Sequence, residues 1–391
     1  QVSETPLVWV LKSQRAGENT QLNALASALG WGYQVKQIHY RPGFPYFLLS
    51  SSLRGIDVEQ SGFSEPWPDL VISASAKNEP VSRWIRDHAG KPVRLVHLGR
   101  PWASLKHFDL IVSTPQYRLP DRDNVYTNTV PMHFPVDSDK ASKDIHHWGV
   151  RLNHLPKPYI ALMVGGNSGP YTFDQRAIQR LVQEADQMAK SVGGSLLVST
   201  SARTPQQVAN YLGTHLSAPH YFHRWGVADA NPYYAFLALA ESIVVTGDSI
   251  SMLSEACATL KPVYIFDLGE RSVSMRTQQY FSKECLQYYL GQGFAHFELD
   301  YLRNIIYRLA MWKGPKRLTR DLRLVHAALI AQKRAVWLGD EFFENQQRQP
   351  FQDVSRTVNH IKRLLNKPVL PDVSTSTPQD SLLTPAFTGS E

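Results

Sequence analysis

The sequence predicts an α/β fold: two Rossmann-like domains, each a doubly wound parallel sheet, face each other across a cleft, and C-terminal helices pack back across both. Short apolar runs alternate with helix-length segments through most of the chain, a pattern typical of parallel sheets. A polar stretch ending in LPKP at 155–158 separates two such series. The length of 391 residues allows two domains with separate cores.

The predicted domain boundaries follow changes in composition. The first domain is expected at 1–145, a linker at 146–157, the second domain at 158–315 and a group of C-terminal helices at 316–366. Residues 367–391 contain four Pro, repeated Ser and Thr and few bulky apolar residues. A disordered tail is therefore predicted there.

Each strand is predicted from an apolar run bounded by turn residues. The expected strands are 7–11, 33–40, 69–73, 93–97, 109–112 and 125–127 in the first domain, then 159–164, 195–199, 220–222, 243–246 and 262–266 in the second. The expected helices include 20–29, 205–216, 252–259, 275–290, 299–312, 317–337 and 351–366.

The stretch 243–266 carries the clearest chemical signal. A buried strand leads into the turn formed by Gly247, Asp248, Ser249, Ile250 and Ser251, and a helix follows. The amino end of a helix beyond a parallel strand binds anions, because its free N–H groups and its dipole face the turn. Glu255 lies one helical turn beyond Ser251, where it could accept hydrogen bonds from a ribose. The alternative is that Ser251 caps the helix and Ser254 or Glu255 completes a capping box.

A second glycine-containing turn follows the strand at 159–164. Its glycines allow close backbone approach, and its polar side chains can donate to a phosphate; these residues are Gly165, Gly166, Asn167 and Ser168. The Lys and Ser/Thr of a P-loop are missing, which argues against an ATPase. Arg203, beyond the next strand, could meet a nucleotide phosphate.

Polar residues also follow strands of the first domain. The loop at 15–21 carries Glu18, Asn19 and Gln21, where a doubly wound sheet exposes its carboxyl edge. The alternative for this loop is ordinary helix capping and a solvated turn. Arg100 follows the fourth strand, and its guanidinium suits a phosphate or carboxylate.

Charge and composition favour some partners over others. The net charge is +7, and residues 301–366 hold 13 Lys and Arg against 5 Asp and Glu. This basic region, together with an aromatic segment at 40–53, suggests an anionic membrane surface, or else solvated helix faces and a buried loop. No nucleic-acid motif accompanies it, so nucleic acid is not expected.

Two cysteines, no signal-peptide pattern and no long apolar run predict a cytoplasmic protein, with a peripheral position on the inner membrane as a further expectation.

Several motifs together resemble the Elm-type mitochondrial fission family, whose bacterial members have no assigned role. The motifs are GENTQ at 17–21, FDLIV at 108–112, NVYTNTVPMH at 124–133, LPKP at 155–158, GGNSGPY at 165–171 and the continuous match at 231–266. The family is similar in fold to GT-B glycosyltransferases. The chain departs from the family at 74–78, where a Gly-Arg pair is usual.

The resemblance implies a GT-B glycosyltransferase that uses a nucleotide diphosphate sugar, with UDP favoured, and a lipid-linked or glycan acceptor. It implies that Asn231 and the loop before it frame the base, that Arg271 and Arg276 lie near the diphosphate, and that no metal or cofactor is needed. Glu18 is the predicted catalytic base, with Asp69 and His97 as alternatives, and Asn19, Gln21 and Arg100 are predicted to lie on the acceptor side. Two other functions stay open: a non-catalytic fission-type scaffold that retains nucleotide binding, and a sugar-nucleotide 2-epimerase.

Overall fold

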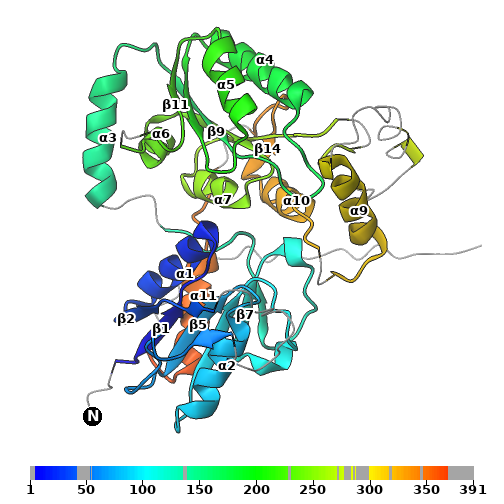
Figure 1. Cartoon of the computed structure of the whole chain (residues 1–391). Coiled ribbons are helices and arrows are strands. Elements are labelled where there is room, and N and C mark those ends of the chain that lie inside the picture. The colour runs from blue at the N-terminus through cyan, green and yellow to red at the C-terminus, as the bar shows by residue number, and fades with distance from the viewer. Residues whose placement is uncertain are drawn as a thin grey trace, which may run out of the picture.

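The computed structural model describes residues 5–41, 53, 55–134, 139–227, 230–270, 273–276, 283–284, 287, 299–316, 319–343 and 347–368. Within them the chain forms two six-stranded parallel sheets, one above the other in Figure 1, and the predicted fold class is confirmed. The predicted aromatic segment at 40–53, the helix at 275–290 and the tail fall largely outside these residues.

The first sheet has the strand order β2-β1-β5-β6-β7-β8. Its strands are β1 (Val8–Leu11), β2 (Tyr33–Lys36), β5 (Leu70–Ala74), β6 (Arg94–Leu98), β7 (Leu110–Ser113) and β8 (Val125–Thr127), and β3 (His39–Tyr40) pairs with β4 (Ile56–Asp57) beside it. Helices α1 (Ala16–Leu29) and α2 (Glu79–His88) and two 3-10 turns, η2 (Leu105–His107) and η3 (Pro115–Tyr117), complete this domain. Every residue of β1 and β5 is buried, because helices cover both faces.

The second sheet has the order β11-β10-β9-β12-β13-β14, which is the Rossmann order 3-2-1-4-5-6. Its strands are β9 (Tyr159–Val164), β10 (Ser195–Thr200), β11 (His220–His223), β12 (Ser242–Thr246), β13 (Val263–Phe266) and β14 (Ala335–Trp337). The helices are α3 (Asp139–Leu152), α4 (Gln175–Ser191), α5 (Gln206–His215), α6 (Tyr233–Leu239), α7 (Ile250–Ala258), α9 (Leu299–Lys313), α10 (Arg323–Ala331) and α11 (Asp353–Leu364).

Two segments differ from the sequence prediction. The single helix predicted at 317–337 is wrong: α10 ends at Ala331, Lys333 takes a positive φ of 56°, and β14 then pairs with β13. Helix α3 covers the first half of the linker predicted at 146–157, and its Trp148 and Leu152 pack into the core of the second domain. The domain boundaries themselves stay predictions.

The C-terminal helix returns to the first domain, as predicted. Val358 and Ile361 of α11 are buried in one core cluster with residues of β1, α1 and β5, and the Asp353 carboxylate accepts hydrogen bonds from the N–H groups of Thr129 and Val130 at 2.9 and 3.2 Å. Two doubly wound domains with a returning C-terminal helix make up a GT-B-like arrangement. Among the described residues, no helix is both long and apolar enough to cross a membrane.

Candidate functional site

The switch point of the second sheet lies between β9 and β12. The chain builds outward from β9 toward β11 on one side, and from β12 toward β14 on the other. Ligands of open α/β sheets bind outside the carboxyl ends of the strands at such a point. The two turns that were predicted to bind the donor, 165–168 and 247–251, both begin here.

Hydrogen bonds join these two turns directly. The N–H of Gly165 donates to the Thr246 hydroxyl at 2.8 Å, and the N–H of Gly166 donates to Oδ2 of Asp248 at 2.9 Å. Arg203, which follows β10, donates to the same Oδ2 at 2.8 Å and to the carbonyl of Asn167 at 3.1 Å. Three separately predicted segments therefore meet at one edge of the sheet.

The paired glycines are required by this close approach. A Cβ atom at Gly165 would lie 2.2 Å from the Asp248 carboxylate, and one at Gly166 would lie 2.0 Å from the carbonyl oxygen of Arg203. Neither distance is possible without displacing the neighbouring atoms. The glycines thus serve contact between the turns, besides any contact with a ligand that was predicted for them.

Asp248 is the charge at the centre of this edge. Its side chain is fully buried, whereas that of Arg203 is 45% exposed. Burial raises the pKa of Asp248, and the positive charge of Arg203 opposes that rise. The N–H of Gly166, in a turn that was predicted to bind a phosphate, thus donates to a carboxylate. The two predicted side-chain donors also have protein partners: Asn167 Oδ1 accepts from the N–H of Phe173, and the Ser168 hydroxyl accepts from Arg320.

Helix α7 begins one residue after Ser249. Among the described residues no side chain caps it, so the alternative prediction of a capping box from Ser251 is wrong. Ser249 and Ile250 are buried, and Ser251 is exposed. The first-turn N–H groups of a helix have no partner within the helix. The exposed part of the predicted anion site is therefore Ser251 and the N–H groups beside it.

Glu255 of α7 meets two tyrosines from the start of α6. Its Oε2 accepts a 2.5 Å hydrogen bond from Tyr233, and its Oε1 a longer one of 3.4 Å from the more exposed Tyr234. Burial raises the pKa of Glu255, and the two hydroxyls oppose the rise. Asn231 is exposed and turns the chain into α6 by accepting the N–H of Tyr233 at 3.1 Å.

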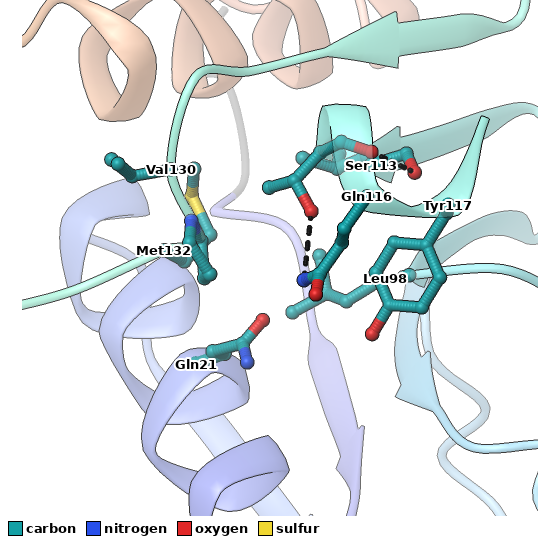
Figure 2. A pocket seen from close by; sticks show the side chains of 11 residues that line it. Gln21, Leu98, Ser113, Gln116, Tyr117, Val130 and Met132 are labelled. Atoms are coloured by element: carbon teal, nitrogen blue, oxygen red, sulfur yellow. Dashed lines mark hydrogen bonds between the residues drawn. The ribbon is translucent and has the colours of Figure 1, made fainter. Parts of the chain in front are cut away.

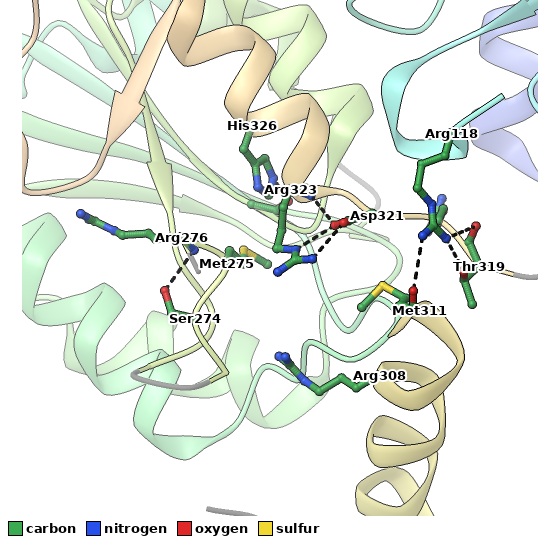
Figure 3. A network of polar contacts seen from close by, with 12 residues as sticks. Arg118, Ser274, Met275, Arg276, Arg308, Met311, Thr319, Asp321, Arg323 and His326 are labelled. Atoms are coloured by element: carbon green, nitrogen blue, oxygen red, sulfur yellow. Dashed lines mark hydrogen bonds and ion pairs between the residues drawn. The ribbon is translucent and has the colours of Figure 1, made fainter. Parts of the chain in front are cut away.

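Residues from the C-terminal region lie over the turn after β12. His326 of α10 is within 2.6 Å of the Gly247 carbonyl oxygen, and Arg323 makes a two-point ion pair with Asp321 at 2.9 Å. Figure 3 shows these residues gathered at the start of α10, with Arg308 of α9 pointing toward the same region. Burial lowers the pKa of His326 to about 4, so this histidine is neutral at pH 7.

Glu18 and Asn19 lie at the carboxyl edge of the first sheet, and both hold Ser13. The Ser13 hydroxyl donates to Glu18, whose carboxylate also pairs with Arg15 at 3.6 Å. Asn19 accepts from the Ser13 N–H and donates to its carbonyl, each at 2.8 Å. These hydrogen bonds hold the predicted base, Glu18, just after β1. The switch point of the first sheet lies between β1 and β5.

Gln21 lines a small hollow with Leu98, Gln116, Tyr117 and Met132, as Figure 2 shows. The hollow has a volume of about 20 Å³, which suits one water and not a sugar. Arg100 donates to the carbonyl of Tyr117 at 2.5 Å at the same end of the sheet. Gln21 and Arg100, both predicted on the acceptor side, thus lie near η3.

The two alternative predictions for the catalytic base are wrong, because neither side chain lies open at the carboxyl edge of the first sheet. Asp69 precedes β5 and so lies at the amino edge of the sheet, where it pairs with Lys91 at 2.9 Å. His97 is fully buried within β6 beside Ser73, and burial lowers its pKa to about 3. Arg276, predicted near the diphosphate, instead reaches the Leu338 carbonyl and Asp340, and Arg271 lies outside the described residues.

The segment that departs from the family pattern lies next to the Glu18 loop. Ser75 takes a positive φ of 75°, Lys77 donates to Gln14 at 2.9 Å, and Asn78 donates to the carbonyls of Leu11 and Lys12. The loops after β1 and β5 therefore flank the first switch point together.

Sequence reasoning missed several partners at the site. Tyr233, Tyr234, His326 and Thr246 were read as helix or strand residues without a role at this edge. The adjacent tyrosines in NPYYAF were the available signal, because two hydroxyls at a helix start need acceptors when buried.

Among the described residues, no cluster of three or more His, Cys, Asp or Glu side chains is placed to hold a metal ion. Independence of a metal stays a prediction.

Solved structures align with most of the chain at low similarity. MurG of Acinetobacter baumannii is 12% identical, with a TM-score of 0.42 over 92% of this chain and 99% of that one. MnaA of S. aureus, in a structure with UDP, is 15% identical, with a TM-score of 0.40 over 94% and 99% of the two chains. Scores this low carry no functional argument, and the fold assignment rests on the strand orders.

Sequence relatives are more informative. The mitochondrial fission protein ELM1 of Arabidopsis thaliana is 25% identical over 242 residues, which are 56% of this chain and 56% of that protein, so the chain spans little more than half of that relative. An uncharacterized protein of Rickettsia prowazekii (strain Madrid E) is 27% identical over 296 residues, 66% of this chain and 82% of that protein. The family model described as mitochondrial fission ELM1 matches residues 16–283. Because this match covers more than half of the chain, the chain belongs to the mitochondrial fission ELM1 family.

Proposed function

We propose that this chain is a GT-B-type glycosyltransferase that moves a sugar from a nucleotide diphosphate sugar, with UDP favoured, to a membrane-associated or glycan acceptor. One observation carries the proposal: the turns after β9 and β12 and the arginine after β10 meet at the switch point of a sheet with Rossmann order. This is the place in such a sheet where nucleotides bind.

The diphosphate would lie at the amino end of α7, beside Ser251. Free N–H groups of the helix and the half-exposed guanidinium of Arg203 supply positive charge there. The ribose would bind Oε1 of Glu255, because the 3.4 Å contact with Tyr234 is the weaker of the two that hold this carboxylate. Tyr234 and Trp225 expose ring surface for the base.

The transfer step needs one base and no bound metal. An acceptor hydroxyl oxygen forms a bond to the anomeric carbon, the bond from that carbon to the phosphate oxygen breaks, and the nucleoside diphosphate leaves with the electron pair. The hydroxyl proton passes to Glu18, which Ser13 and Arg15 hold in place. The helix terminus and Arg203 would stabilise the departing charge.

A second candidate is a scaffold that keeps the fold without transferring sugar. The observation that favours it is Asp248, a buried carboxylate that already occupies the Gly166 N–H group and Arg203. A phosphate would have to share these donors with a like charge. The family name, which refers to fission and to no reaction, is consistent with this candidate.

Binding of the donor is the first test. A panel of UDP, ADP and GDP sugars should include one that raises the melting temperature of the full chain. At about 100 times its Kd, such a ligand stabilises the folded state by about 2.7 kcal/mol. Donor hydrolysis, measured with and without a membrane extract, separates the two candidates, because a scaffold binds without turnover. A panel with no melting shift at millimolar concentration would refute the donor site.

Glu255→Gln is the matched variant for the ribose contact. The amide keeps the shape of the side chain and loses its charge, so donor affinity measured by calorimetry should fall by about 1.5–3 kcal/mol. Glu241→Gln is the control, because Glu241 is exposed at the opposite end of β12. Equal donor affinity in the two variants would show that Glu255 does not bind the donor.

A further inference from the structure

The outer face of α9 is apolar, which is the reverse of an ordinary surface helix. Leu302, Ile306, Leu309 and Trp312 are 45%, 56%, 40% and 49% exposed. Their spacing of four, three and three residues places them on one side of the helix. Single exposed apolar residues are common on proteins, but a continuous helical stripe is typical of an interaction surface.

The inner face of α9 carries the polar residues. Asn304 and Arg308 are buried there with Met311, and Arg308 donates to the carbonyl of Val273 at 3.1 Å and lies 5.5 Å from the ring of Tyr171. Figure 3 shows Arg308 pointing from α9 toward the region of Arg323 and Met275. These contacts fix the rotation of α9, because turning the apolar stripe inward would break them and move Asn304 and Arg308 to the outer side.

The charges around the stripe are mostly positive. Residues 301–320 contain six Lys and Arg and no Asp or Glu, and the one acidic residue in the sequence of α9 is Asp300 in its first turn. Arg303, Lys313 and Lys316 are exposed, and the Lys313 ammonium lies 4.5 Å from the centre of the Trp312 ring. An apolar stripe with Trp and Leu, edged by cations, is what an interfacial helix presents to a membrane with anionic lipids.

We propose that α9 docks this chain on an anionic lipid bilayer, with Leu302, Ile306, Leu309 and Trp312 entering the headgroup boundary and Arg303, Lys313 and Lys316 facing the lipid charges. The excess of positive charge favours a bilayer over a second copy of the chain, because two copies of this face would repel each other. The biological role of this docking rests on the proposed function. Docking through α9 would bring the enzyme to an acceptor that is held in the membrane.

Flotation with vesicles tests the docking directly. The full chain should float with vesicles of phosphatidylcholine containing 30% phosphatidylglycerol at low salt, and less with neutral vesicles or at 0.5 M salt. The double variant Ile306→Ser, Leu309→Ser should lower the bound fraction at least tenfold. Lys313→Gln and Lys316→Gln should each lower the partition constant by up to about fivefold.

A control variant separates docking from general loss of apolar surface. Val150→Ser, Val192→Ser removes two equally exposed apolar side chains, on α3 and just beyond α4, and should float like the wild type. Circular dichroism melts show whether the variants are folded. Failure of the wild type to float at low salt, or flotation that survives Ile306→Ser, Leu309→Ser, would overturn the proposal. A dimer that the same double variant dissociates without changing flotation would also overturn it, by assigning the stripe to a protein interface. Calorimetry with the nucleotide sugar reports separately on the proposed function, because it needs no membrane.

Discussion

His326 shows how one buried side chain makes stability depend on pH. The neutral imidazole fits its site beneath Gly247, and burial lowers its pKa to about 4 from an ordinary value of 6.5, with Arg323 adding to the decrease and Asp321 opposing it. Between these two pH values the unfolded chain binds a proton that the folded chain does not. The contribution of His326 to stability is therefore complete above pH 6.5 and is lost as the pH falls toward 4.

The variant His326→Gln should flatten this part of the stability profile. An amide can still donate to the Gly247 carbonyl and does not titrate, so up to about 3 kcal/mol of the loss between pH 6.5 and 4 should disappear. Urea unfolding at pH 4, 5, 6 and 7 measures it. His146→Gln, on the exposed side of α3, is the control and should keep the wild-type slope. A variant with the same slope as the wild type would show that His326 does not cause the dependence.

At the same scale, the sequence could place Glu255 and Asp248 at the site but could not supply their partners. The residue types and their spacing after a strand predict the edge of the sheet at which both lie. Asp248 and Arg203, and likewise Glu255 and Tyr233, are more than twenty positions apart. Such contacts depend on how neighbouring strands align, and a single local pattern carries no information on that alignment.

At the scale of elements, the turn after β9 is shaped by contact with the turn after β12. Gly165→Ala would place a methyl group 2.2 Å from the Asp248 carboxylate, so either turn must move. Overpacking of this kind costs about 1–3 kcal/mol. Chemical unfolding should show that loss, and calorimetry should show weaker donor binding. Gly32→Ala is the control, because no atom lies within 4 Å of its added Cβ and its φ is not positive. Equal stability of the two variants would mean that the turns adjust freely.

Some elements could be predicted and others could not, for identifiable reasons. β9 and β12 are continuous apolar runs with both faces covered, and their pattern is decisive. β14 has three residues, Ala335–Trp337, directly after a helix, and its apolar residues continue the spacing of α10. This segment forms a strand because it pairs with the open edge of β13, and that edge exists only once the sheet has assembled.

At the scale of the whole molecule, contacts from two parts of the C-terminal region connect the second domain to the first. Arg118, directly after η3, donates to the Thr319 hydroxyl at 2.5 Å, and the N–H of Asp321 donates to the carbonyl of Gln116 at 2.8 Å, so the segment that leads into α10 is fixed to the first domain. Helix α11 is the second connection, and it buries Val358 and Ile361 in the first domain's core. The core of the first domain is thus completed by a helix from the other end of the chain.

Ile361→Ala tests this dependence. Ile361 is fully buried against residues of β1 and α1, and removing three of its carbons should lower the free energy of unfolding by about 2–5 kcal/mol. Because the cavity opens in the first domain, hydrogen exchange should speed up in β1, β5 and α1 and change little in β9 and β12. Arg363→Ala, exposed on the same helix, is the control and should leave both sets of amides protected. Equal loss of protection in the two sheets would show that the domains unfold as one unit, and no loss in either would show that the first domain does not depend on the Ile361 contact.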